Sequence, residues 1–176
     1  MKSDSVERRR HGVASGYPKP YEVFPGLPTN LDAAVYWPNE NILLFKGNQY
    51  WRTSGTTVDN GYPLIIACGW PGLPDDIDAA VVWGRNRKGY FFKGTQYWRF
   101  ILTRQTERVH RSYLIAGYNQ GTADAAIQWS NGRTFLFKDE LYWLYNDAND
   151  LVDSGYPLWT TKHWLGCPTN GPTVSM

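Results

Sequence analysis

Short apolar runs separated by polar turns recur along the chain at a fixed spacing. Three copies begin at Asp32, Asp78 and Asp124, and successive copies start 46 residues apart. Each copy holds one apolar run, a turn, a second run that ends in Phe-Lys, and a third run with a Tyr-Trp pair. Three strand-length runs within this period leave no room for a long helix and a parallel crossover. The pattern therefore predicts a repeated, small antiparallel sheet.

The central copy shows the expected elements most clearly. We expect strands at Ala79–Trp83, Tyr90–Lys93 and Gln96–Phe100, and a fourth, outer strand near Arg108–His110. The first strand is small at its start and aromatic at its end, which suits a strand that packs beside a narrow axis. Small residues near an axis and bulky ones outside give the wedge shape of propeller blades. The predicted fold class is all-β.

A closing segment follows the aromatic strand. It runs from Gly-Tyr-Pro to Gly-x-Pro and occurs at residues 16–28, 61–74 and 155–168. Gly and Pro end the outer strand, and we expect Pro to open a short helix, as at Lys19–Phe24. The central copy lacks Gly-Tyr-Pro, so we expect a looser or re-routed outer edge there.

The repeat divides the chain into six segments. We predict a disordered lead or linker at 1–15, the remnant of a first unit at 16–31, complete units at 32–77, 78–123 and 124–168, and a tail at 169–176.

Composition changes this picture little. Hydrophobic residues make up 42% and charged residues 19% of 176 residues, as in an ordinary globular protein, whereas nine Trp and twelve Tyr suit a β-rich fold. A net charge of +2 is too small to argue for nucleic acid. No apolar run of about 20 residues predicts a membrane span. The N-terminus has no apolar core of a signal peptide, which leaves open a cytosolic protein or a piece of a longer secreted one.

Several motifs occur together in each copy. Asp-Ala-Ala, a Trp five residues after the Asp, Phe-Lys and the Tyr-Trp pair recur in order, before the Gly-Tyr-Pro and Gly-Leu-Pro closures. Over about residues 16–168 these motifs resemble hemopexin repeats, most of all those of the C-terminal domain of a matrix metalloproteinase. The resemblance implies a four-bladed β-propeller whose first blade is incomplete. The three complete units would be blades two, three and four.

The resemblance also implies a function. It points to a non-catalytic, extracellular binding module that recognises extracellular-matrix protein or a metalloproteinase inhibitor. The chain has no His-Glu-x-x-His motif and three scattered histidines, so we expect no zinc and no catalytic residue in it. It could be a fragment of a zinc metalloendopeptidase. Two alternatives stay open: a free-standing binder of a small ligand such as heme, and a vitronectin-like adhesive protein.

An ion in the propeller channel is a further implication of the resemblance. Main-chain carbonyls at the start of the inner strands would hold Ca²⁺, which prefers oxygen ligands, and a deeper ring could hold a second ion. The residues concerned are Asp32, Asp78 and Asp124 for the first ring, and Ala34, Ala80 and Ala126 for the second. Alternatively, Asp caps each strand and Ala merely fits the narrow axis. With one blade incomplete, a fourth ligand is missing.

Aromatic residues are expected between the blades. One ring of each pair Tyr50-Trp51, Tyr97-Trp98 and Tyr142-Trp143 should pack there, because neighbouring residues on a strand point to opposite faces. We expect the same inter-blade position for Trp37, Trp83 and Trp129.

Basic residues gather in the central copy. The candidate binding residues are Arg85, Arg87, Lys88, Arg104, Arg108 and Arg111, with His110 beside them. They form either an ordinary solvated surface or a docking site for acidic protein or sulfated glycan, whose binding would weaken with salt.

The two cysteines permit one disulfide without requiring it. In secreted proteins that this chain resembles, the last cysteine is bonded to one at the start of the first blade. That start is missing here, so the resemblance implies that the partner of Cys167 is absent and that Cys68 is a free or buried thiol. The uncovered face of the second blade should also promote self-association.

Overall fold

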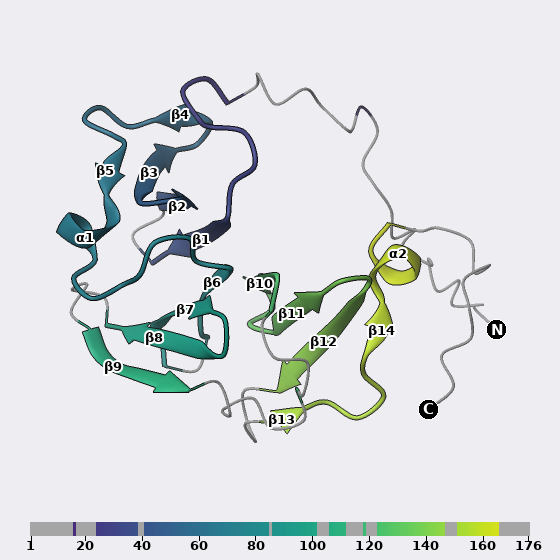
Figure 1. Ribbon diagram of the computed structural model, residues 1–176. Helices are drawn as coiled ribbons and strands as arrows, with labels where there is room; N and C mark the ends of the chain where they lie inside the picture. Colours follow the sequence, from purple (N-terminus) through teal and green to yellow (C-terminus); the bar gives the residue numbers. More distant parts are fainter. Residues whose placement is uncertain are drawn as a thin grey trace.

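The described residues form three antiparallel sheets that surround a common centre (Figure 1). The computed structural model describes residues 16, 24–38, 41–84, 86–101, 106–111, 118, 123–146 and 151–165, and for 106–111 the backbone alone. Each sheet begins with one Asp-Ala-Ala strand and proceeds outward. The described fold is all-β, and we call the sheets blade II, blade III and blade IV in chain order.

Blade II contains five strands and one short helix. Its elements are β1 (Ala33–Trp37), β2 (Asn41–Lys46), β3 (Gln49–Ser54), β4 (Thr57–Val58), β5 (Leu64–Ile65) and α1 (Ile66–Gly69). The order is β1-β2-β3-β4, and β5 also pairs with β3. Both short strands thus share the outer edge of β3: β4 pairs with Thr53 and Ser54, and β5 pairs with Gln49 and Tyr50.

Blade IV repeats this plan, and blade III does not. Blade IV comprises β10 (Ala125–Gln128), β11 (Thr134–Lys138), β12 (Leu141–Asn146), β13 (Leu151–Val152), β14 (Leu158–Trp159) and α2 (Thr160–His163). Blade III comprises β6 (Ala79–Val82), β7 (Gly89–Lys93), β8 (Gln96–Phe100) and β9 (Thr106–Arg111). Its six-residue outer strand replaces the pair of two-residue strands seen in the other two blades.

The closing segments of blades II and IV each contain the expected short helix, α1 and α2, but the helix does not begin at the Pro as predicted. The peptide bonds before Pro63 and Pro157 are cis, and Pro63 leads into β5 while α1 begins only at Ile66. The reason is that Leu64 and Ile65 find backbone partners on β3 before the chain can turn helical. The stretch Lys19–Phe24 lies outside the described residues except for Phe24, as do the predicted lead and tail.

The core lies between the blades in two clusters. One joins blades II and III and includes Trp70, Phe91 and Trp98, and the other joins blades III and IV and includes Tyr97 and Trp143. The neighbours Tyr97 and Trp98 therefore face opposite blades, as predicted for the pair. Blade III therefore buries apolar side chains on both faces and lies between blades II and IV in the packing.

Two of the three repeated Trp residues fill these interfaces. Trp37 is 3% exposed and packs on blade III, where a Cβ on Gly89 would lie 2.5 Å from its ring. Trp83 is 7% exposed and packs on blade IV. The prediction fails for Trp129, which is 47% exposed and touches Trp164. Among the described residues, no further blade packs against this side of blade IV to cover Trp129.

Candidate functional site

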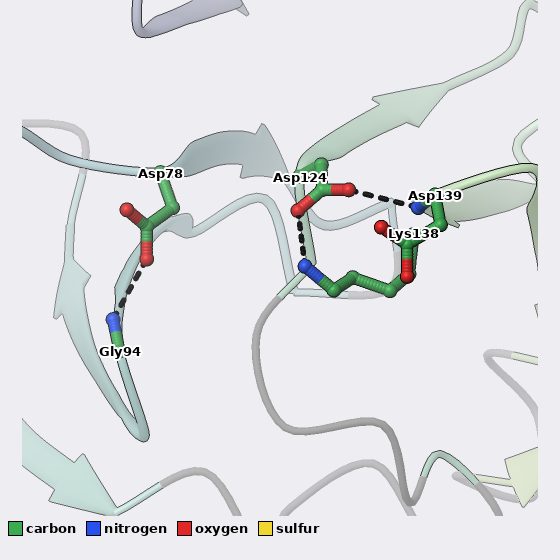
Figure 2. A network of polar contacts seen from close by, with 5 residues as sticks. All are labelled: Asp78, Gly94, Asp124, Lys138 and Asp139. Atoms are coloured by element: carbon green, nitrogen blue, oxygen red, sulfur yellow. Dashed lines mark hydrogen bonds and ion pairs between the residues drawn. The ribbon is translucent and has the colours of Figure 1, made fainter.

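The three predicted Asp residues directly precede the innermost strands and line one central cavity, and in blades II and IV they are held alike. Asp32 accepts hydrogen bonds from Lys46 Nζ at 2.6 Å and from Gly47 N at 2.7 Å. Asp124 accepts them from Lys138 Nζ at 2.6 Å and from Asp139 N at 2.8 Å (Figure 2). Each carboxylate thus fixes the turn between the second and third strands of its own blade.

Blade III keeps half of this arrangement. Gly94 N donates to Asp78 Oδ2 at 2.7 Å (Figure 2), but Lys93 Nζ donates to the carbonyl of Asp75 at 2.6 Å instead. In all three blades the backbone N–H that donates to the carboxylate belongs to a residue in the left-handed conformation. The φ angles are 57°, 55° and 52° at Gly47, Gly94 and Asp139. Asp139 takes a conformation that usually favours glycine.

The electrostatics of Asp124 reflect these contacts. Burial alone would raise the pKa of Asp124, but the hydrogen bond from Asp139 N and the ammonium of Lys138 outweigh it, so the pKa lies below its ordinary value. The same pairing raises the pKa of Lys138. The carboxylate of Asp124 is therefore charged, and already engaged, at neutral pH.

The cavity that these Asp residues line has a volume of about 660 Å³. The inner strands β1, β6 and β10 line it, and the six predicted ion-site residues, Asp32, Ala34, Asp78, Ala80, Asp124 and Ala126, all contribute. Its walls also include Tyr36 and Ile42 of blade II and Ile127 and Trp164 of blade IV. The cavity thus extends from the channel into the space between blades II and IV.

The chemistry of the donors limits what ion could bind there. Among the described residues no group of three or more His, Cys, Asp or Glu side chains could hold a metal. The carboxylates of Asp32 and Asp124 are bound to Lys and backbone N–H groups. The carboxylate of Asp78, which accepts one hydrogen bond, from Gly94 N, and the main-chain carbonyls of three strands are the oxygen donors that remain for a hard cation.

The predicted basic residues are only partly described. Arg87 is exposed and Lys88 half-buried at the end of the connection between β6 and β7. Arg85 and Arg104 lie outside the described residues, and Arg108 and Arg111 belong to β9, for which the backbone alone is described. Cys68 is a free, exposed thiol on α1, whereas Cys167 lies outside the described residues.

Sequence reasoning missed a second polar cluster at the outer edge of blade II. Asp59 accepts hydrogen bonds from Arg52 Nε and from Ser54 Oγ, the latter at 2.8 Å, and Arg52 lies over the ring of Tyr62 at 5.1 Å. We call these four residues the outer clamp. The hydrogen bond from Ser54 and the pairing with Arg52 hold the pKa of Asp59 below its usual range. The signal was an Asp seven residues after the Arg of Tyr-Trp-Arg.

Wedge-shaped antiparallel sheets whose innermost strands share one channel define a β-propeller, here with an incomplete ring of blades. The hemopexin family model matches residues 31–75, 77–113 and 124–167. The chain therefore belongs to the hemopexin family.

Curated relatives place it nearest to matrix metalloproteinases. It is 31% identical over 173 residues to matrix metalloproteinase-2 of Drosophila melanogaster, which covers 93% of this chain and 22% of the relative. It is 33% identical over 180 residues to stromelysin-3 of Xenopus laevis, covering 99% of this chain and 38% of the relative. The chain thus spans well under half of either protein and corresponds to their hemopexin-like, non-catalytic part.

Solved structures confirm the fold. The hemopexin-fold protein CP4 from cow pea superposes with a TM-score of 0.63 at 20% identity, over 76% of this chain and 69% of that one. The seed albumin LS24 from Lathyrus sativus gives 0.64 at 22% identity, over 76% and 68%. Among the described residues, no helix is long and apolar enough to cross a bilayer.

Proposed function

We propose that this chain is the recognition domain of a secreted, matrix-metalloproteinase-like protein, and that it binds extracellular-matrix protein or a metalloproteinase inhibitor. The observation that carries the proposal is how the repeated residues are used. Most of the Asp, Lys and aromatic residues that recur in the units hold turns or fill the interfaces between blades, and Trp129 is an exception. Residues of one unit without counterparts in the others include Arg87 and Lys88 on the connection between β6 and β7, where a partner could reach them.

Blade III supplies the basic part of this surface. Arg87 and Lys88 lie on the connection between β6 and β7, and the long outer strand carries Arg108 and Arg111 in sequence. Scattered guanidinium and ammonium groups suit an acidic protein segment or a sulfated glycan, with affinity that falls as salt screens the charges. An extracellular location agrees with such partners.

The test is direct binding of the purified domain to an immobilised fibrillar collagen and to an immobilised metalloproteinase inhibitor, followed by surface plasmon resonance at low and physiological salt. We expect saturable binding to at least one of them, weakened by the double variant Arg87→Glu, Lys88→Glu. A double variant at exposed residues of blade II, Thr56→Glu and Thr57→Glu, is the matched control. If neither the collagen nor the inhibitor shows saturable binding, the proposal is refuted.

A channel ion belongs to the same proposal. Ca²⁺ would be held by the main-chain carbonyls at Asp32, Asp78 and Asp124, and a second ion by those at Ala34, Ala80 and Ala126. The support is the convergence of these six residues on one cavity and the hard-oxygen preference of the ion. The ion would tie the three inner strands together.

A binder of a small ligand is the second candidate, because the cavity of about 660 Å³ has predominantly apolar walls and a size common for ligand sites. For heme, titration of the domain would give a saturable change of the Soret band. A spectrum that equals the sum of free heme and protein would exclude heme and leave the first candidate untouched.

A further inference from the structure

Blade IV contains the outer clamp of blade II with one part missing. In blade II, Asp59 N donates to the carbonyl of Arg52 at 2.9 Å, and in blade IV Asp153 N donates to that of Leu144 at 2.9 Å. The strand registers agree, since Thr53 pairs with Val58 and Tyr145 with Val152. Leu144 therefore occupies the position of Arg52.

The other parts of the clamp are in place. Asp153 Oδ1 accepts a hydrogen bond from Asn146 Nδ2 at 2.9 Å, as Asp59 Oδ1 does from Ser54. Tyr156 meets Tyr142 with ring centroids 5.5 Å apart at 74°, while Tyr62 meets Tyr50 at 5.5 Å and 77°. The guanidinium is thus the one component of the clamp that blade IV lacks.

A pocket of about 260 Å³ lies at this place. Its walls are formed by Leu144, Asn146 and Asp153 on the outer strands and by Asn131 and Arg133 on the β10–β11 turn. No described residue donates to Asp153 Oδ2, the atom that corresponds to the oxygen Arg52 binds in blade II. The Asp153 carboxylate, with one oxygen unpaired among the described residues, thus lines a pocket at the place where blade II has the guanidinium of Arg52.

We propose that this pocket binds the guanidinium group of an arginine side chain presented by a partner protein. The inference rests on the proposed recognition function and names one contact within it. An incoming guanidinium would complete the clamp at Asp153, because its planar fork matches a carboxylate.

Arg133 is the one cation among the described residues that line the pocket, and it pairs with no described carboxylate. A positive charge at the wall repels an arriving guanidinium and competes with it for Asp153. Arg133 therefore weakens binding of a cation, whereas it would strengthen binding of an anion. The effect of removing it separates the two kinds of ligand.

The experiment titrates the isotope-labelled chain with N-acetyl-arginine methylamide and follows backbone amide resonances by NMR. The matched probe is the citrulline analogue, which has nearly the same shape and no charge. We expect saturable shifts at Asn146 and Asp153 with the arginine compound, with a dissociation constant on the order of millimolar for one side chain, and none with citrulline.

Three variants give the residue assignment. Asp153→Asn keeps the shape and should weaken binding about tenfold or more through loss of the charge. Arg133→Gln should strengthen it about two- to fivefold. Leu144→Arg installs the blade II arrangement and should block the pocket. Asp59→Asn in blade II is the control and should leave affinity unchanged. Melting curves report whether each variant folds.

Equal response to arginine and citrulline, an unaffected Asp153→Asn variant, or weaker binding by Arg133→Gln would each overturn the proposal. The first result needs only the unaltered chain, so it holds even if a variant fails to fold. If the arginine compound binds but no matrix protein or inhibitor does, the recognition function fails and the pocket stands. If such a partner binds and the arginine compound does not, the pocket alone fails.

Discussion

Trp83 of blade III meets Tyr145 of blade IV edge to face, with ring centroids 4.4 Å apart and planes at 87°. Tyr90 contacts the same indole from within blade III at 4.9 Å. Aromatic pairs of this geometry contribute about 0.5–1.5 kcal/mol beyond their buried area. This contact therefore joins two blades that share no backbone hydrogen-bond ladder.

Replacing Trp83 by Ala should remove this joint. The indole is buried, so the substitution leaves a cavity between blades and should lower the free energy of unfolding by about 3–5 kcal/mol. Trp129→Ala is the matched control, because that residue holds the same repeat position but is half exposed, and it should cost about 1 kcal/mol. Urea unfolding measures both. Equal losses would show that Trp83 does not act as an inter-blade contact.

The strands were predictable because their signals are local. The limits of Gln96–Phe100 agree with β8, since alternation and the flanking turn residues lie within the strand itself. Trp129 has the same local motif as Trp83, yet it is exposed, because burial of this residue requires a neighbouring blade that packs against it. A local motif predicts the strand in which it lies, but it does not predict whether another blade packs against that strand.

The polar contacts were less predictable for a related reason. Asp32 and Lys46 are 14 residues apart and meet only after the hairpin has formed. The resemblance to hemopexin repeats implied that six residues of an ion site share one channel, and in the structure these six residues line one cavity. It gave no sign that the carboxylates of Asp32 and Asp124 would be taken by turn N–H groups and lysines, because these contacts require the register of β1 on β2 and of β10 on β11.

The lowered pKa of Asp124 makes part of the stability depend on pH. A carboxyl group whose folded pKa lies below its unfolded value of about 3.9 stabilises the fold above that value, and the contribution is lost as pH falls through the folded pKa. The unfolding free energy should therefore fall between about pH 5 and pH 2, and less steeply in Asp124→Asn. Denaturation at each pH measures this. Identical pH profiles for the two proteins would contradict the assignment.

The open cavity should make the isolated domain self-associate. Tyr36 is 60% and Ile42 37% exposed on blade II, and Ile127 is 40% exposed on blade IV. Exposed apolar residues that share one cavity form a patch that favours association. Sedimentation velocity should show concentration-dependent oligomers.

The double variant Tyr36→Lys, Ile127→Lys should reduce this association. The matched control is Leu64→Lys, which removes an equally exposed apolar residue of the outer strand β5. An unaltered chain that stays monomeric at high concentration would count against the prediction. Equal loss of oligomers in both variants would instead place the contact outside the cavity.

The channel ion gives a prediction that distinguishes main-chain from side-chain ligands. A site with three carbonyl-bearing strands should bind Ca²⁺ with a dissociation constant of about 0.1–1 mM, as in weak extracellular sites. At about 10 mM Ca²⁺ the stabilisation is then about 1.4–2.7 kcal/mol, which calorimetry detects as a rise of several degrees in the melting temperature.

Because the proposed donors are carbonyls, Asp32→Asn should lower the melting temperature through loss of its bond to Lys46 but keep the Ca²⁺-dependent rise. A rise that disappears in Asp32→Asn would assign the ion to the carboxylate, and no rise in the unaltered chain would remove the ion from this channel.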